Sequence, residues 1–299
     1  MDLSIIIPSY NTAKETCECI ASIYKSLESL KVIKSKNYEI IVFDNNSNDD
    51  TVSRIKRQFP HVILLQNKEN LGYGKGNNAA VKKARGETIL FLNSDIVVLK
   101  NAIETLYSFF IQYEQTYQLL GARLRNRDMT LQPSAAPFFS LAVVFAALFL
   151  KGDYWGLTRY SPPVPKQVDW VSGACFMIRK KSFERLGGFD EHIFMYMEEV
   201  DFMYRARKQG LLVGFCPAAE FIHYGAFSSN KGEIKIKPIV NLFKGFLYFY
   251  QKHKSKEELN MLKLLLLAKA RIGMIAGRLF HNAYLKQTYE EAYRLVQKS

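Results

Sequence analysis

Acidic and amide side chains follow the most telling apolar stretch of the chain. The run Thr88–Asn93 leads directly into Ser94 and Asp95. The run predicts a buried strand, and in open α/β sheets ligands bind at the carboxyl ends of the strands. A carboxylate there can hold a divalent cation against a phosphate, because hard cations prefer oxygen ligands. The competing interpretation is an Asx turn that only ends the strand.

Two other segments place polar groups after expected strands. Asp44 follows the apolar run Glu39–Phe43, and its carboxylate could accept hydrogen bonds from a nucleobase or ribose; a helix-capping loop is the alternative. The segment 70–78 carries three glycines at alternate positions, with Lys75 among them. Glycine permits close backbone approach, and free amides at a helix start attract phosphate. The spacing matches neither a Walker loop nor a dinucleotide fingerprint.

Titratable groups also gather in the second half of the chain. Glu198, Glu199 and Asp201 lie at the start of a helix expected over Glu198–Lys208. An ionised carboxylate there can act as a general base toward a hydroxyl. Simple matching of negative charge to the helix dipole is the alternative. His223 follows an expected strand; a single histidine is usually structural, but one that reached Asp95 would complete an oxygen and nitrogen metal site.

The elements that must position these residues can be predicted from periodicity. The first 125 residues alternate β-rich runs with helical patterns, which predicts a parallel sheet with crossover helices. Thr12 and Glu15 predict a capping box at the first helix. The expected strands are Leu3–Ile7, Glu39–Phe43, Val62–Gln66, Thr88–Asn93, one near Leu119–Leu124, Val168–Ile178 and Leu211–Cys216. A helix is expected over Ala102–Gln112, and the chain beyond residue 235 is expected to be helical.

The 299-residue chain has a net charge of +13, and most of that charge lies near its end. Residues 231–299 carry 14 Lys/Arg and 5 Asp/Glu. Such a basic tail suggests an anionic partner, either a membrane or a nucleic acid, although a solvated helical face is nearly as good an explanation. The four cysteines are irregularly spaced, which favours reduced packing residues in a cytosolic protein. The amino terminus has no basic leader typical of a secretory signal.

Two apolar segments admit more than one interpretation. The run Phe138–Leu150 is too short to span a bilayer, and it could be a core helix, a lid or a membrane-facing patch. Across Lys256–Phe280, four basic residues fall on one side of the expected helix and four apolar residues on the other. The basic residues are Lys256, Lys263, Arg271 and Arg278, and the apolar ones are Met261, Leu265, Ile272 and Leu279. Membrane-surface binding and packing on the rest of the protein explain this pattern equally well.

Taken together, the motifs resemble glycosyltransferase family 2, and most closely its rhamnosyltransferase-like members. The matching segments are Ser4–Asn11, Asp44–Ser47, Asn70–Asn78, Leu92–Asp95 and Trp170–Ala174 onward to His223. The resemblance implies a GT-A fold, that is, a Rossmann-like mixed α/β sheet flanked by helices. The implied domains are a catalytic domain over 1–230, with a nucleotide-sugar half (1–125) and an acceptor half (126–230), and a basic helical region over 231–299.

The resemblance also implies the roles of individual residues. It places the nucleoside on Pro8, Tyr10, Asn11 and Asp44, and it adds Asn46, Gly72, Lys75, Asn77, Asn93 and Ser94 to the donor site. Asp95 would bind Mg²⁺ or Mn²⁺, with His223 as second ligand. Glu199 would be the base, or Glu198 if the helix start shifts. Asp201, Trp170 and Gly173 would contact the acceptor or support the site.

The implied reaction is inverting transfer from a nucleoside-diphosphate sugar, with dTDP-rhamnose as the first donor and UDP-sugars as the second. The acceptor would be a glycan or a lipid-linked glycan in cell-surface polysaccharide synthesis, on the cytoplasmic side and with possible peripheral contact to an anionic membrane. No nucleic acid is expected as partner. Two departures from the family pattern weaken these implications. Asn93 replaces a common aspartate, which predicts weaker metal binding, and Glu199 replaces a common aspartate base.

Three other functions compete with this one. A sugar nucleotidyltransferase would place a glycine-rich basic loop after the first strand, where this chain has Pro8–Asn11. A basic nucleic-acid-binding protein would interleave aromatic residues with cations, which the tail does not do. An inactive scaffold would have no need of Asp95, the two glutamates and His223.

Overall fold

The computed structural model describes residues 1–28, 37–225 and 238–299. It contains two compact units. The first, here called the sheet unit, takes Met1–Pro137, Arg159–Phe194 and the described part of Glu198–Glu233. The second, the helical unit, takes Phe138–Thr158, Met195–Met197 and the described part of Ile234–Ser299. The domain boundary expected at residue 230 lies outside the described residues, and it stays a prediction.

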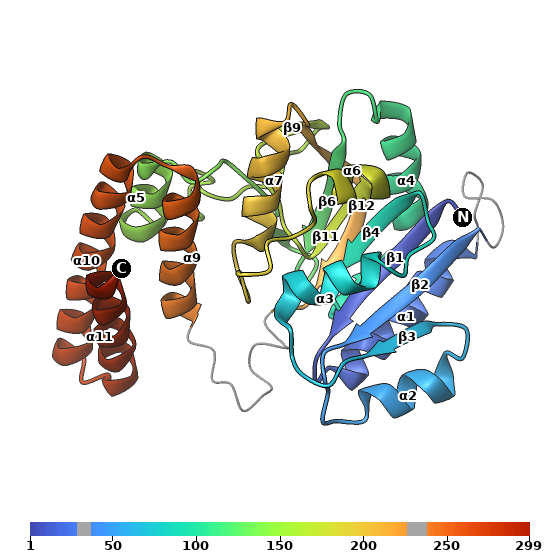
Figure 1. The fold of residues 1–299 in the computed structure, drawn as a ribbon, viewed down its shortest axis with the longest axis horizontal. Helices are drawn as coiled ribbons and strands as arrows, with labels where there is room; N and C mark the ends of the chain where they lie inside the picture. Colours follow the sequence, from blue (N-terminus) through green and yellow to red (C-terminus); the bar gives the residue numbers. More distant parts are fainter. Residues whose placement is uncertain (29–36, 226–237) are drawn as a thin grey trace. The chain divides into compact units, whose positions relative to one another are not determined.

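The first half of the sheet unit is a parallel sheet, as predicted (Figure 1). Its strands are β1 (Leu3–Ser9), β2 (Tyr38–Asp44), β3 (Ile63–Gln66) and β4 (Thr88–Leu92), in the order β3-β2-β1-β4. The predicted strands are therefore confirmed, with ends that differ by one or two residues. Ser9 pairs with Asp44 at the carboxyl ends of β1 and β2. Because all four strands run the same way, their carboxyl ends share one edge.

The second half of the sheet is mixed. β11 (Cys175–Arg179) runs antiparallel between β4 and β6 (Leu119–Arg125). Beyond them lie β12 (Val213–His223), parallel to β6, and β5 (Ile96–Val98), antiparallel to β12. β12 is longer than the predicted Leu211–Cys216, because pairing resumes after a register shift between Cys216 and Glu220. Pro217 lies in that shift, and proline has no amide to give to a ladder.

The single strand predicted over Val168–Ile178 is wrong. The chain there forms three short strands with different partners. β9 (Lys166–Val168) pairs with β12, and β10 (Trp170–Val171) pairs with β8 (Ala135–Ala136) in a separate small sheet. A turn then brings the chain into β11. Alternating apolar residues predict each piece as extended, but they carry no information about where the partner changes.

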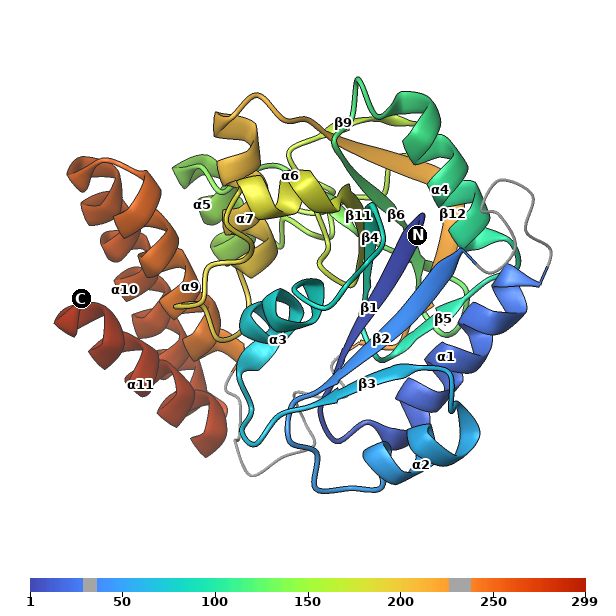
Figure 2. The same ribbon diagram turned by 45° about the vertical axis from the view of Figure 1, so that its right-hand side comes forward.

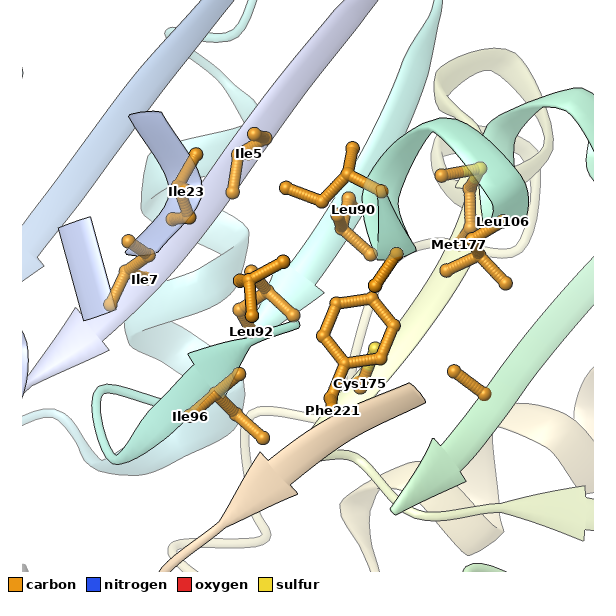
Figure 3. Close-up of a cluster of buried hydrophobic side chains, with 14 of the residues drawn as sticks. Ile5, Ile7, Ile23, Leu90, Leu92, Ile96, Leu106, Cys175, Met177 and Phe221 are labelled. Atoms are coloured by element: carbon orange, nitrogen blue, oxygen red, sulfur yellow. The ribbon is translucent and has the colours of Figure 1, made fainter. Parts of the chain in front are cut away.

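Helices cover both faces of the sheet (Figure 2). α1 (Ala13–Leu27) and α4 (Ala102–Tyr113) pack on the face that carries Ile5, Leu90 and Met177, and Figure 3 shows this cluster with Ile23 from α1 and Leu106 from α4. The other strand positions point to the opposite face, because strand side chains alternate. There Phe91 and Phe176 meet aromatic rings from α6 (Lys180–Arg185) and α7 (Glu198–Lys208). α3 (Gly72–Val81) packs on β1 and β2, and α2 (Thr51–Gln58) packs on α1. β7 (Leu131–Gln132) extends the edge of β6.

The helical unit contains α5 (Leu141–Phe149), α9 (Pro238–His253), α10 (Lys256–Leu279) and α11 (Ala283–Lys298). The helical C-terminal region is thus confirmed for the residues described. α5 packs on α10 with Val144 and Leu148 buried, so the apolar run that admitted three interpretations forms a packed helix of this unit. In the described ranges, no helix combines the length and apolarity needed to cross a bilayer. All four cysteines are free thiols, as expected.

Candidate active site

Asp95 and His223 meet at the edge of the sheet. Asp95 lies in the turn between β4 and β5, and His223 is the last residue of β12. β5 and β12 pair so that His223 lies opposite Ile96, and this register brings the two side chains together. His223 Nε2 is 3.4 Å from Asp95 Oδ1, and the Asp95 side chain is almost buried.

Gln132 determines the tautomer of the His223 ring, that is, which ring nitrogen carries the proton when the ring is neutral. Its Oε1 lies 2.7 Å from His223 Nδ1, and an amide oxygen can only accept, so Nδ1 carries the proton. The Gln132 amide nitrogen donates to the His223 carbonyl and to Asn126 Oδ1, which holds the amide in this orientation. In the neutral ring, the lone pair is then on Nε2. Metal-binding histidines are commonly oriented by such an acceptor at the other nitrogen.

This pair fits a hard divalent cation. One carboxylate oxygen and one imidazole nitrogen suit Mn²⁺ or Mg²⁺ better than a soft metal. Across the described part of the chain, no group of three or more His, Cys, Asp or Glu side chains is placed to hold a metal. Asp95 and His223 are the two candidate ligands at this edge. Asn93 contributes no charge, but its amide nitrogen lies 3.3 Å from His223 Nε2.

The loops after β1 and β2 are tied together at the same edge. The Asn11 amide donates to Ser47 Oγ, and Asn11 Oδ1 accepts from the Asn48 amide at 2.7 Å. Asp44 is buried, and its Oδ2 accepts from the Ser47 amide. Its Oδ1 is also buried but has no partner among the described residues. A buried acceptor without a donor is costly, which suits a ligand that supplies an N–H or O–H.

The other expected nucleoside residues lie nearby. Pro8 and Tyr10 are half-buried at the end of β1, and Asn46 is exposed with a left-handed backbone. The predicted capping box at the first helix is wrong, because Thr12 makes no cap hydrogen bond. Its hydroxyl donates instead to Ser94 at 3.1 Å. This bond links the loop after β1 to the loop after β4.

The glycine-rich segment differs from the expected phosphate cradle. Three amides at the start of α3 already donate to protein acceptors: Leu71 to Asn45 Oδ1, Gly72 to Asn70 Oδ1, and Tyr73 to the Phe194 carbonyl. The expectation of free amides at this helix start is therefore wrong for these three. Asn45 was not selected from the sequence as a site residue, yet it joins β2 to α3.

Close packing explains the alternate glycines. A Cβ on Gly72 would lie 2.3 Å from the Phe194 carbonyl oxygen, and one on Gly74 would lie 3.2 Å from Phe189 Cβ. Asn77 is fully buried and donates to the Tyr73 carbonyl, while Lys75 is half-buried. The segment thus fixes the loop that precedes α7, and its role toward a donor stays a prediction.

Glu198, which is buried, and Glu199, which is half-buried, form an acidic pair at the start of α7. One carboxylate oxygen of each has no hydrogen-bond partner in the described structure. Burial raises the pKa of both carboxyl groups, and the neighbouring Glu199 charge raises the pKa of Glu198 further. For Glu199 the rise in pKa through burial is partly offset by its own and neighbouring amides, including Gly173 N–H, and by the Arg159 guanidinium. Glu199 is therefore the member that ionises first.

A short path of contacts connects this pair to the Asp95 edge. The Gly173 N–H favours the ionised Glu199 carboxylate and lowers its pKa, and the Gly173 carbonyl accepts from the Tyr73 hydroxyl at 2.6 Å. The carbonyl of the next residue, Ala174, accepts a hydrogen bond from the backbone N–H of Asn93 at 3.0 Å. Tyr73, Gln132 and Arg159 were all missed in the sequence, because nothing in their local pattern distinguishes them.

Two residues expected to contact the acceptor or to support the site lie in the interior. Trp170 is buried, and its indole N–H donates to the Pro137 carbonyl at 2.8 Å. Asp201 is 1% exposed and accepts from Arg205, whose guanidinium also holds the Leu186 and Gly188 carbonyls. An acceptor cannot reach either side chain as placed. Of the two predicted roles, only the supporting one fits these positions.

The fold and the edge define a class of protein. A parallel nucleotide-type half-sheet, a mixed half-sheet and an acidic loop between β4 and β5 make up a GT-A glycosyltransferase fold. S. aureus TarS has this fold: its structure of residues 1–349 in complex with UDP aligns with a TM-score of 0.55 and 18% identity, over 100% of this chain and 91% of that one. In a longer TarS structure this chain spans 55% of the length.

Sequence comparison gives the family. The model of glycosyl transferase family 2 matches residues 4–187, so the chain belongs to that family and is a glycosyltransferase. It is 30% identical to the N-acetylglucosaminyl-diphospho-decaprenol L-rhamnosyltransferase of Mycobacterium tuberculosis, over 69% of this chain and 72% of the relative. It is 28% identical to rhamnosyltransferase WbbL of Escherichia coli, over 68% of this chain and 78% of the relative. Because the chain belongs to this family, the sugar nucleotidyltransferase interpretation is no longer needed.

Proposed function

We propose that this protein transfers a sugar, with inversion, from a nucleoside-diphosphate sugar to a hydroxyl of a glycan or lipid-linked acceptor in cell-surface polysaccharide synthesis. dTDP-rhamnose is the preferred donor, because two relatives that match over about two thirds of the chain are named rhamnosyltransferases. A UDP-sugar is the second candidate, since a protein of the same fold binds UDP. The lipid-diphosphate name of the mycobacterial relative supports a lipid-linked acceptor.

One observation carries the proposal: the path from Asp95 through Asn93, Ala174 and Gly173 to Glu199. The Asn93 backbone N–H donates to the Ala174 carbonyl, and the N–H of the preceding residue, Gly173, lowers the pKa of Glu199. A cation-binding loop and a buried base are thus joined by a few backbone atoms. A metal-assisted inverting transfer uses both, because the leaving diphosphate and the attacking hydroxyl lie on opposite sides of the anomeric carbon.

The donor end would use the groups at the carboxyl edge of the sheet. Asp44 Oδ1 would accept a hydrogen bond from the nucleoside, which would satisfy its buried lone pair. Asp95 and His223 would hold Mg²⁺ or Mn²⁺. Such a cation neutralises charge on a departing diphosphate. Gln132 would keep His223 Nε2 unprotonated for this role.

The acceptor end would use the acidic pair. Glu199 would take the proton from the acceptor hydroxyl as its oxygen attacks the anomeric carbon and the nucleoside diphosphate leaves. A base is most effective when its pKa is near the working pH, and burial moves the pKa of Glu199 upward in that direction. Glu198 would stay protonated beside it, because two buried carboxylates do not readily ionise together.

The reaction would take place on the cytoplasmic face of a membrane, where a lipid-linked acceptor presents its hydroxyl. The basic residues of the helical unit would contact that membrane, which makes the protein peripheral.

Calorimetry with dTDP, UDP and their sugars, with and without Mn²⁺, tests the donor end. Asp95→Ala should abolish the metal-dependent part of binding. Glu199→Gln should keep donor affinity while turnover falls about 10²- to 10⁴-fold. Glu198→Gln should retain most of the turnover, because glutamine mimics a protonated glutamate. If Glu198→Gln alone removed turnover, the base would be Glu198. Normal metal-dependent binding by Asp95→Ala would refute the metal role.

A further inference from the structure

We propose that an exposed apolar stripe along α10 docks the helical unit on the surface of an anionic lipid bilayer. The stripe, here called the α10 stripe, consists of Met261, Leu264, Leu265, Ala268, Ile272, Ile275 and Leu279. This inference rests on the membrane location proposed above and not on the transfer reaction.

The α10 stripe is not used by the core of its own unit. Ile272 and Ile275 are 54% and 55% exposed, and Leu279 is 70% exposed. The buried side of the same helix is formed by Leu262, Leu266, Ala270, Gly273 and Gly277. A Cβ on Gly273 would overlap the Tyr289 ring, and one on Gly277 would overlap Lys286, so α11 packs on that side. α10 therefore has one apolar side against its unit and a second one open.

The stripe is long and continuous. The spacing of Met261, Leu265, Ala268, Ile272, Ile275 and Leu279 alternates between four and three residues, which keeps them on one side of the helix. At 1.5 Å per residue they extend over about 27 Å. Scattered exposed apolar residues are ordinary, but a contiguous row of this length marks an interaction surface.

Charge identifies the partner. Arg271 and Arg278 border the stripe on one side, and both are exposed. Lys269 borders it on the other side, where its ammonium donates to the Leu148 carbonyl of α5. The sequence has no Asp or Glu between Glu258 and Glu290, so no carboxylate of α10 beyond its first turn balances these cations. A second copy of the helix would bring like charges together, whereas an anionic surface complements them.

The ends of the stripe also suit an interface between water and lipid. Phe280, just after α10, and Tyr284, in the first turn of α11, are 79% and 63% exposed. Large aromatic side chains are enriched at the level of lipid headgroups. A helix with an apolar side, basic borders and too few apolar residues to span lies in the plane of the membrane.

Vesicle flotation with the full chain tests the proposal. The wild type should bind vesicles of phosphatidylcholine and phosphatidylglycerol in equal parts, and bind pure phosphatidylcholine vesicles much less. Ile272→Ser/Ile275→Ser should lower the partition coefficient about fivefold or more, because it removes two side chains from the apolar contact. Arg278→Gln should lower binding roughly fivefold on the anionic vesicles only. Val164→Ser is the matched control: Val164 is 60% exposed but lies in the sheet unit, and its loss should leave binding unchanged.

Several results would overturn the proposal. They are absence of wild-type binding to the anionic vesicles, equal binding by the wild type and the double variant, or a wild-type dimer that the double variant dissociates without any vesicle binding. Binding to RNA in place of vesicles would overturn it as well. Thermal unfolding should show the double variant folded, since both positions are exposed; Leu279→Ser serves if it is not. Binding of dTDP measured in the same samples separates this proposal from the proposed reaction, because each can fail alone.

Discussion

Replacing Gln132 should weaken the metal binding proposed for Asp95 and His223, although Gln132 is not itself one of the proposed ligands. Gln132 Oε1 accepts a hydrogen bond from His223 Nδ1 at 2.7 Å, and in the neutral ring the lone pair is then on Nε2, which faces Asp95. Gln132→Met keeps the length of the side chain but removes the acceptor. The Nδ1 proton then has no partner in the protein, and the ring is free to rotate or to place its proton on Nε2.

The size of the effect follows from this one hydrogen bond. Loss of the group that orients a metal-bound histidine typically costs 10- to 100-fold in metal affinity. That range corresponds to about 1.4–2.7 kcal/mol. The dissociation constant of Mn²⁺ should therefore rise by this factor when it is measured by calorimetry in the presence of saturating dTDP. Binding of dTDP without metal should not change, since Gln132 contacts neither Asp44 nor Asn11.

Gln132→Glu is the matched control. A carboxylate at the same place still accepts a hydrogen bond from Nδ1. The Mn²⁺ affinity should therefore stay within a few-fold of the wild type. A Gln132→Met variant whose Mn²⁺ affinity lies within twofold of the wild type would refute the reasoning, because His223 would then be oriented without this bond. Equal losses in both variants would point to disturbance of β7 in place of a tautomer effect.

Two further predictions concern the base and the glycine loop. Arg159→Gln should raise the pKa of Glu199 further, because it removes a cation that favours the ionised carboxylate; the acidic limb of the pH profile of kcat/KM should move to higher pH, and an unmoved limb would exclude the coupling. Gly72→Ala should lower the free energy of unfolding by about 2 kcal/mol or more, since it combines a left-handed backbone with a clash against Phe194. Gly187→Ala is the control, because φ there is +78° and a Cβ would meet no atom within 4 Å. Urea unfolding should show a smaller loss in the free energy of unfolding for this variant, and equal losses in the two variants would exclude the clash.

The sequence predicted best what local pattern determines. Four parallel strands and α7 were found close to their observed bounds, because alternating or helical apolar residues mark the buried side of each element. The edge position of Asp95 followed from the same pattern, since its strand is buried and parallel. Its meeting with His223 was anticipated only as a possibility, because the β5–β12 register depends on residues far apart in the chain.

Contacts between distant segments limited the prediction elsewhere. Gln132 lies in a two-residue strand without periodicity, and Tyr73 looks like one more residue of a glycine-rich helix start. Both matter through partners about 90 to 100 residues away. The prediction of a single strand over Val168–Ile178 was wrong for the same reason, because the segment pairs with different strands along its length. The sequence predicted an apolar side on α10. It could not predict that this side is exposed, because that depends on which side of the helix packs against the rest of the unit.

Under the proposed function, the pairing of β6 with β11 bears on how the choice of acceptor can diversify. These strands are neighbours in the sheet, paired through Gly121 and Phe176, although 49 residues separate Arg125 from Cys175. The intervening chain leaves and returns like the loop of a hairpin, and it gives α5 to the helical unit on the way. The free-energy cost of closing a longer loop grows only slowly with length. Under the proposed function, the part of this excursion that belongs to the helical unit, Phe138–Thr158, can therefore change in length while Gln132, Arg159 and Gly173 keep their places beside His223 and Glu199. The range of acceptors and the catalytic groups need not then change together.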